Sequence, residues 1–211
     1  GSNRFGQLGL DLSVVISSAP VQFRNMISPG NIKAGGNITA YVDNGYLYQC
    51  GYLGLKNVFV PELINKISGG KEFDVSELCI AIDKDNKLWQ WGISTYDQKF
   101  REATSISEPV RIAGLKNVTS IDAKRGQVLA IRNNTALVAW GNGYFATGSD
   151  REEMFGYAKE INTMTSVHSA VRGKHHNIMI LDYDVQGWGS NTNYPMGDIG
   201  SKVRTVTDTC M

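Results

Sequence analysis

The sequence predicts an all-β protein built from four tandem repeats. Three observations support this class: one motif returns four times, its apolar residues alternate with a period of two, and turn residues separate the runs. Alternation of this kind places successive side chains on opposite faces of a strand. No stretch shows helical periodicity of comparable strength. The segment 150–161, with Glu152, Glu153, Met154 and Phe155, is the best helical candidate, and we expect a loop with one helical turn there.

The composition excludes several classes of protein. The 211 residues include 21 Lys and Arg against 20 Asp and Glu, for a formal net charge of +1. This balance provides no basic surface, so we expect neither nucleic acid nor a membrane surface as a partner. Hydrophobic residues make up 42% of the chain, which argues against disorder. No apolar run is long enough to span a bilayer as a helix.

The repeated motif consists of an apolar alternating run, a turn, a second run, and then an aromatic residue or Cys followed by Gly. Its four copies occupy residues 40–51, 80–92, 129–141 and 178–189. Residues 1–9 line up with 189–197, so the chain also begins on a closing glycine. The closing glycines are Gly1, Gly51, Gly92, Gly141 and Gly189. We therefore treat residues 1–211 as a single region of four repeats, each of about 47 residues.

Turn residues and prolines mark the strands within each repeat. Asn44-Gly45 is a strong signal for a two-residue hairpin, and Asp85-Asn86 and Asn133-Asn134 are expected to serve the same role. A second marker lies upstream of each copy and opens an apolar stretch: Pro20, Pro61, Pro109 and, in the fourth copy, Ala158. About 47 residues suffice for four strands of about five residues with their turns, the size of one β-propeller blade.

The motifs resemble the regulator of chromosome condensation repeat family. The residues that carry the resemblance are Asn3-Arg4-Phe5-Gly6-Gln7-Leu8-Gly9, Ala34-Gly35, Asp43-Asn44-Gly45 and three Trp-Gly pairs. The repeats are degenerate, because Cys50 precedes Gly51 and residues 69–74 replace the Ala-Gly pair in the second copy. The resemblance implies a β-propeller, which in this family usually closes with seven blades. Four visible blades predict a partial propeller with further blades in a larger chain, or a section that self-associates as a homodimer.

The pattern of the motif suggests structural roles for its aromatic and glycine residues. We expect Trp91, Trp140 and Trp188 to pack between neighbouring blades, where each indole covers about 150–250 Å². The glycine after each of them would let the chain leave the strand at a backbone angle forbidden to other residues. The structural set therefore consists of Trp91, Trp140, Trp188, Gly51, Gly92, Gly141 and Gly189.

No motif for catalysis is present in the sequence. His175 and His176 are adjacent, and adjacent strand residues face opposite sides, so they do not form a metal pair. No Ser/His/Asp motif or phosphate-binding glycine loop occurs, and the three cysteines fit neither a disulfide framework nor a zinc site. We therefore predict no enzyme activity, no cofactor and no metal. Unpaired cysteines favour a reducing, cytoplasmic setting.

Binding is the predicted use of such a scaffold, because loops on rigid frameworks carry recognition. Aromatic and Arg residues after the closing glycines should lie on one face, and they are the candidate partner contacts: Arg4, Tyr52, Tyr96, Tyr144, Phe145 and Tyr194. We predict a non-catalytic protein-binding scaffold. The resemblance implies an alternative, guanine-nucleotide exchange on a Ran-like small GTPase. The low charge and the many Asn, Thr and Tyr residues suggest a second alternative, a surface lectin-like or inhibitor module.

Overall fold

A computed structural model gives the fold of the chain. It describes residues 1–23, 26–54, 56–94, 104–112, 114–124, 126–141, 155–161, 166–173, 176–182, 184–190 and 203–204. Within these ranges the regular elements are all strands, which confirms the predicted all-β class. No helix in the described part of the chain has the length and hydropathy needed to cross a bilayer.

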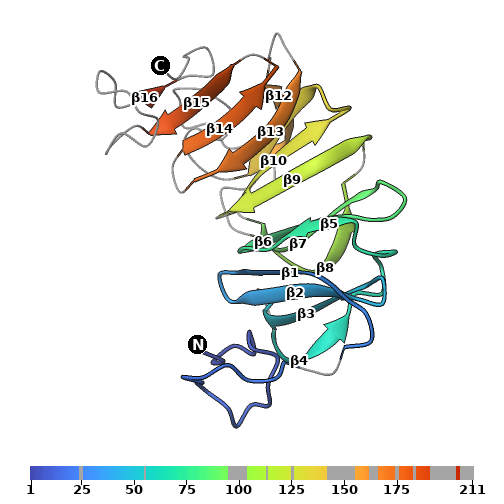
Figure 1. Ribbon diagram of the computed structural model, residues 1–211, viewed down its shortest axis with the longest axis vertical. Coiled ribbons are helices and arrows are strands. Elements are labelled where there is room, and N and C mark those ends of the chain that lie inside the picture. The colour runs from blue at the N-terminus through green and yellow to red at the C-terminus, as the bar shows by residue number, and fades with distance from the viewer. Residues whose placement is uncertain are drawn as a thin grey trace. The chain divides into compact units, whose positions relative to one another are not determined.

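In the part of the chain that the structure describes, sixteen strands form four antiparallel sheets of four strands each. Figure 1 shows their arrangement within each sheet. Neighbours in each sheet are also neighbours in the sequence, so every sheet is a simple up-and-down meander, as expected for propeller blades. The four sheets confirm the four predicted repeats. The strands are β1 Pro29–Gly35, β2 Ile38–Asp43, β3 Tyr46–Tyr52, β4 Asn57–Leu63, β5 Glu72–Asp74, β6 Leu78–Ile82, β7 Leu88–Ser94, β8 Thr104–Arg111, β9 Val118–Lys124, β10 Gln127–Arg132, β11 Ala136–Gly141, β12 Phe155–Ile161, β13 Val167–Arg172, β14 His176–Leu181, β15 Val185–Ser190 and β16 Val203–Arg204.

The chain divides into two compact units. The first unit comprises Gly1–Ser94 and Thr104–Gly114, and the second comprises Thr95–Ala103 and Leu115–Met211. The first unit therefore holds the sheets β1–β4 and β5–β8, and the second holds β9–β12 and β13–β16.

The proline-led stretches at Pro61 and Pro109 belong to the sheet that precedes them along the chain. Pro61 lies in β4, which pairs with β3, and Pro109 lies in β8, which pairs with β7. Ala158 lies in β12, which pairs with β11. Each stretch is thus the fourth strand of the preceding sheet, so the boundaries between the sheets do not coincide with the start of the sequence repeat. Residues around Pro20 form no strand, and their segment makes an isolated bridge between Ser2 and Ile16.

The predicted loop with a helical turn at 150–161 is also wrong where the structure describes it. Phe155–Ile161 is β12, and it pairs with β11 from Leu137↔Ile161 to Gly141↔Phe155. The free edge of β11 offers backbone donors and acceptors, and pairing with them outweighs a weak local helical preference. Residues 150–154 lie outside the described ranges.

The hairpin turns show how asparagine replaces glycine in this chain. Asn44 and Gly45 have φ values of 49° and 77°, and Asn133 and Asn134 have 56° and 57°. Two successive positive φ values define the tight turn that matches the twist of paired strands. The third predicted turn is longer, because only Asn86 has a positive φ, at 57°, and β6 and β7 are joined by residues 83–87.

Each unit has a hydrophobic core that joins its two sheets. In the first unit, Trp91 of β7 is fully buried among residues of both sheets, including Ile38, Leu47 and Phe73. In the second unit, Trp188 of β15 is fully buried in a cluster that also contains residues of β10, β11 and β14. Trp140 is 4% exposed. A buried indole therefore lies between the two sheets of each unit.

The closing glycines share one backbone conformation. Their φ values are 110° at Gly51, 96° at Gly92, 105° at Gly141 and 113° at Gly189. In the first three sheets the pairing register shifts next to this residue, between the third and fourth strands. Such a shift is typical of a β-bulge, which bends the strand and redirects the chain that follows it.

Candidate partner-binding surface

The loop of residues 3–9 is held in one shape by a buried asparagine. Asn3 is 1% exposed, and its Nδ2 donates to the carbonyl oxygens of Leu10 at 3.1 Å, Asp11 at 3.4 Å and Val14 at 2.8 Å. Its Oδ1 accepts from the backbone N–H of Leu8 at 2.9 Å. Backbone groups that would otherwise face water are thus satisfied internally, so this long loop has a defined conformation.

The same loop docks on the first sheet. The carbonyl oxygen of Gln7 accepts a hydrogen bond from Thr39 Oγ1 at 2.7 Å and a weak one from Cys50 Sγ at 3.9 Å. Gly6 approaches β4 so closely that an added Cβ would lie 2.3 Å from the carbonyl oxygen of Val58. A Gly residue is required there, since such a distance excludes any side chain.

This docking brings two of the predicted contact residues into one region. The ring of Phe5 lies 5.6 Å from the ring of Tyr52, centroid to centroid, in a tilted arrangement. Arg4 is exposed beside Phe5 in the sequence, whereas Tyr52 is half-buried and its Oη donates to the carbonyl oxygen of Gly54 at 2.7 Å. The pair of rings and the guanidinium-bearing loop form the surface that we call the Arg4 loop surface, consisting of Arg4, Phe5 and Tyr52. The other predicted contacts lie outside the described residues: Tyr96, Tyr144, Phe145 and Tyr194.

A charged groove lies between the fourth strands of the two sheets in the first unit. It has a volume of about 250 Å³ and includes Lys56 and Glu62 from the first sheet. Lys56 Nζ lies 3.0 Å from Glu62 Oε2, and Lys66 Nζ lies 2.7 Å from Glu108 Oε2. The hydrogen bond from Lys66 and its positive charge hold the pKa of the Glu108 carboxyl below its usual value. These exposed pairs contribute little to stability, but they place positive and negative charges alternately along the groove.

The groove is connected to the core of the first unit through one buried side chain. Trp91 Nε1 donates to Gln49 Oε1 at 2.6 Å, and Gln49 Nε2 donates to Glu62 Oε1 at 3.1 Å. Gln49 is 3% exposed, so both ends of its carboxamide are satisfied inside the protein. The orientation of Glu62 at the groove is therefore set by the packing of Trp91.

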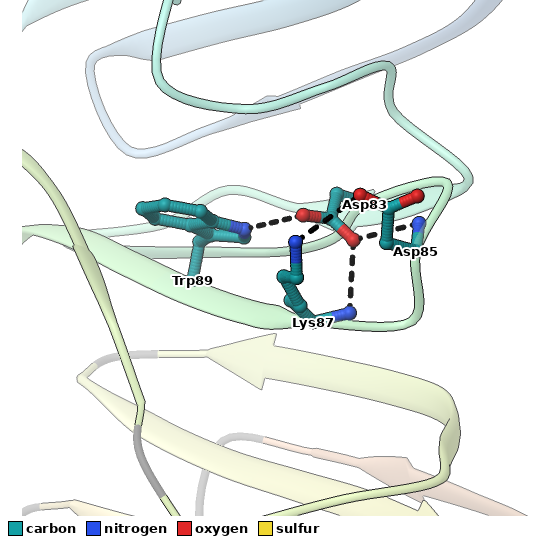
Figure 2. Close-up of polar contacts among 4 residues, drawn as sticks. All are labelled: Asp83, Asp85, Lys87 and Trp89. Carbon is teal, nitrogen blue, oxygen red and sulfur yellow. Dashed lines mark hydrogen bonds and ion pairs between the residues drawn. The ribbon is translucent and has the colours of Figure 1, made fainter.

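The turn between β6 and β7 is organised by a buried carboxylate, as Figure 2 shows. Asp83 is 1% exposed, and its Oδ1 accepts from the backbone N–H groups of Asp85 and Lys87, both at 2.9 Å. Its Oδ2 accepts from Trp89 Nε1 at 2.9 Å. Asp85 pairs with Lys87 Nζ at 3.2 Å on the exposed side of the turn. Asp83 is thus a structural acceptor, and its hydrogen bonds hold the turn and the side chain of Trp89 that follows it.

Replacing Asp83 with Asn is expected to lower the free energy of unfolding by about 1–3 kcal/mol, because one of the three N–H donors then faces an amide N–H₂ group. Urea unfolding followed by circular dichroism measures this change. The matched control is Asp85→Asn two residues away, which removes only an exposed ion pair and should change stability by less than about 0.5 kcal/mol. Equal effects of the two substitutions would contradict the structural role of Asp83.

Nucleophilic and metal-binding chemistry finds little support among the described side chains. Burial raises the pKa of the Cys50 thiol to about 12 and also raises that of Cys79, so both are protonated thiols at neutral pH. Within the described ranges, no three His, Cys, Asp or Glu residues come together in a group that could hold a metal ion. His168 Nε2 lies 2.6 Å from Asp182 Oδ1 on an exposed part of the fourth sheet.

Four meander sheets, each with a positive-φ glycine in the last part of its third strand, define a β-propeller of the regulator of chromosome condensation type. Solved structures confirm this fold. The crystal structure of human WBSCR16 matches with a TM-score of 0.75 at 17% identity, over 99% of this chain and 61% of that one. The crystal structure of Prp20p from Saccharomyces cerevisiae matches with a TM-score of 0.72 at 18% identity, over 91% of this chain and 52% of that one.

Sequence comparison adds one curated relative. Protein pim1 of Schizosaccharomyces pombe is 28% identical over 141 residues, which cover 56% of this chain and 26% of that protein. No family model matches the chain. The chain thus spans about a quarter of this curated relative and about half to three fifths of the two solved structures.

Proposed function

We propose that the chain is a protein-binding β-propeller scaffold without catalytic chemistry of its own. The observation that carries this proposal is the Arg4 loop surface, in which an exposed Arg and the ring of Phe5 lie on a loop fixed by four hydrogen bonds of Asn3, and the ring of Tyr52 at the end of β3 packs beside Phe5. Arg and aromatic residues are enriched among the side chains that dominate binding energy, and a rigid loop loses little entropy on binding.

The related solved structures support protein partners. The structure of Prp20p was described together with its binding properties to Gsp1p and histones, and yeast RCC1 (Prp20) has been crystallised with Kap60 bound to it. We therefore propose these three proteins as the first partners to test. The charged groove of the first unit, with its Lys56–Glu62 and Lys66–Glu108 pairs, would contribute orientation rather than affinity.

The test measures dissociation constants for purified Gsp1p, histones and Kap60 by biolayer interferometry. We expect saturable binding to at least one of them. Arg4→Glu should weaken it at least tenfold, or about 1.4 kcal/mol, because an exposed charge at the contact is reversed. Lys84→Glu, the same charge reversal at the exposed β6–β7 turn, should leave the constant within about twofold. Equal losses in both variants would remove the Arg4 loop surface from the proposal.

Guanine-nucleotide exchange on a Ran-like GTPase is the second candidate, and it is favoured by the likeness to Prp20p. Release of a fluorescent guanine nucleotide from the purified GTPase tests it directly. Stimulated release would make exchange the function, whereas binding without release would favour the scaffold. Binding to a glycan array with no protein bound would instead favour the lectin-like alternative.

A further inference from the structure

The turn between β2 and β3 contains two residues that the proposed function does not use, Asn44 and Gly45. Both are exposed, and the two strands pair up to Asp43↔Tyr46, so the turn consists of these two residues alone. In an Asn-Gly pair the backbone nitrogen of the Gly attacks the carboxamide carbon of the Asn more readily than in other pairs, because Gly has no Cβ to crowd the attack. This turn is therefore a candidate site of spontaneous chemical modification.

The attacking group, the backbone nitrogen of Gly45, lies outside the strand ladder. The last pair of the ladder is Asp43↔Tyr46, and a two-residue hairpin turn has no ladder bond for its second residue. A Cβ added to Gly45 would have no heavy atom within 4 Å beyond its chain neighbours, so the space around this residue is open to solvent. Water therefore reaches both reacting groups while the strands beside them stay paired.

The reaction requires a rotation of the Asn44 backbone, whose φ in the turn is 49°. The end of β2 next to it is fixed, because Asp43 is 5% exposed and its Oδ1 accepts the backbone N–H groups of Ile27 at 2.9 Å and Ser28 at 2.8 Å. The rotation is thus confined to the exposed tip of the hairpin, and exposed turns open at a lower free energy than core strands. We expect the reaction in the folded protein to be slower than in a free peptide, but still to occur.

The third sheet provides an internal comparison. Asn133 and Asn134 lie in the exposed turn between β10 and β11, and their φ values of 56° and 57° are in the same left-handed region as those of Asn44 and Gly45. The residues that follow them, Asn134 and Thr135, both have a Cβ. A similar backbone shape thus occurs with and without glycine as the attacking residue, so the two turns can be compared within one protein.

We propose that Asn44-Gly45 is a site of spontaneous isoaspartate formation, with water as the co-reactant. The backbone nitrogen of Gly45 forms a bond to Cγ of Asn44, and the Cγ–Nδ2 bond breaks. The proton of the Gly45 N–H passes through water to the leaving nitrogen, which departs as ammonia. Water then opens the five-membered succinimide ring. Attack at Cγ gives aspartate, whereas attack at the backbone carbonyl carbon gives isoaspartate, in which the main chain runs through Cγ.

The two products differ in their effect on the hairpin. Aspartate keeps the length of the main chain, and Asp tolerates a positive φ as Asn does. Isoaspartate adds a methylene group to the main chain of the turn, so the turn no longer matches the Asp43↔Tyr46 pair. The carbonyl oxygen of Gly45 also lies close to Gly69, where an added Cβ would be 3.1 Å from it. We therefore expect isoaspartate to open this end of the β2–β3 hairpin and aspartate to leave it closed.

The test incubates the intact protein in mildly alkaline buffer at body temperature and measures each Asn by mass spectrometry after digestion. Labelled S-adenosylmethionine with an isoaspartate-specific carboxyl methyltransferase distinguishes isoaspartate from aspartate. We expect Asn44 to be converted at least about fivefold faster than Asn133 or Asn134, because only Asn44 is followed by glycine. A synthetic peptide of residues 41–48 gives the rate without the fold. An intact Asn44 after the peptide has been converted, or equal rates at the two turns, would overturn the proposal.

Two variants separate the chemistry from the structure. Gly45→Asn gives this turn the Asn-Asn pair that the third sheet already contains, and it should slow conversion of Asn44 to the rate at Asn133. Asn44→Asp has the charge of the products without the added methylene, so its amide hydrogen exchange at β2 should match that of the original protein. The purified isoaspartate form should exchange at least about tenfold faster there.

Conversion that survives Gly45→Asn, or an isoaspartate form that exchanges as slowly as Asn44→Asp, would contradict the proposal. None of these measurements involves the Arg4 loop surface or a binding partner. The modification site can therefore fail or succeed independently of the proposed function.

Discussion

Replacing Trp91 with Ala is expected to lower the free energy of unfolding of the first unit by about 4–8 kcal/mol. A buried Trp→Ala change costs about 3–5 kcal/mol through lost contacts and the cavity it leaves. The buried carboxamide oxygen of Gln49 would also lose its donor, at about 1–3 kcal/mol. Since small domains are stable by about 5–15 kcal/mol in total, this variant should be close to unfolding at 37 °C.

Phenylalanine substitutions separate the hydrogen bond from the packing. Trp91→Phe leaves Gln49 Oε1 without its donor, whereas Trp188→Phe removes an indole N–H that has no acceptor among the described residues. We expect Trp91→Phe to be the more destabilising by about 1–2 kcal/mol, measured by urea unfolding and far-ultraviolet circular dichroism. Adding Gln49→Leu to Trp91→Phe should recover part of the loss, because both polar partners are then absent. Equal losses for the two Phe variants would show that the bond is energetically neutral.

Replacing Gly51 with Ala is expected to cost about 3–5 kcal/mol, the range in which a substitution points to one severe local conflict. Gly51 has a φ of 110°, and an added Cβ would lie 2.0 Å from the carbonyl oxygen of Asn37 and 2.9 Å from the Cα of Ile38. Both neighbours are backbone atoms, one in the first residue of β2 and one in the residue before it, so the methyl group can be accommodated only if this end of the β2–β3 pairing opens. Thermal unfolding and amide hydrogen exchange at β2 measure the effect.

Gly45→Ala is the matched control, because Gly45 also has a positive φ, 77°, but an added Cβ would have no heavy atom within 4 Å beyond its chain neighbours. This variant carries only the conformational cost, about 1–2 kcal/mol. The difference between the two alanine variants therefore measures the contact at Asn37. A Gly51→Ala protein as stable as Gly45→Ala would mean that the closing glycine is required for its φ alone.

Much of the architecture could be predicted because the same motif occurs four times in the sequence. The alternation around Leu88 and Trp91, the turn at Asn44-Gly45 and the spacing of the closing glycines are local signals that depend on no distant partner. They predicted the four sheets and the two-residue turn at Asn44-Gly45 correctly, whereas the turn at Asp85-Asn86 is longer than predicted. The repeat could not predict which sheet contains the stretch at Pro61. The repeat length is the same wherever its first residue is placed, so it does not show where one sheet ends and the next begins.

The residues that organise the candidate surface were harder to predict. Asn3, Gln49 and Asp83 are all polar types common on turns and exposed strand faces, and their sequence neighbours do not distinguish a buried carboxylate from a solvated one. Their roles come from partners up to 42 positions away, as with Gln49 and Trp91. One local signal for Asp83 was available, since an Asp at the start of a hairpin turn can accept backbone N–H groups two and four residues later.

The pairing of each proline-led stretch with the preceding sheet determines where the chain can be divided. A fragment that ended just before Pro61 would contain β1 to β3 but only part of β4. The next fragment would begin with the rest of β4, which would be separated from β3, the strand with which it pairs. Cuts within residues 65–71, between β4 and β5, instead leave every four-stranded sheet complete. Recombination or circular permutation of this chain should therefore follow the sheet boundaries and not the sequence period.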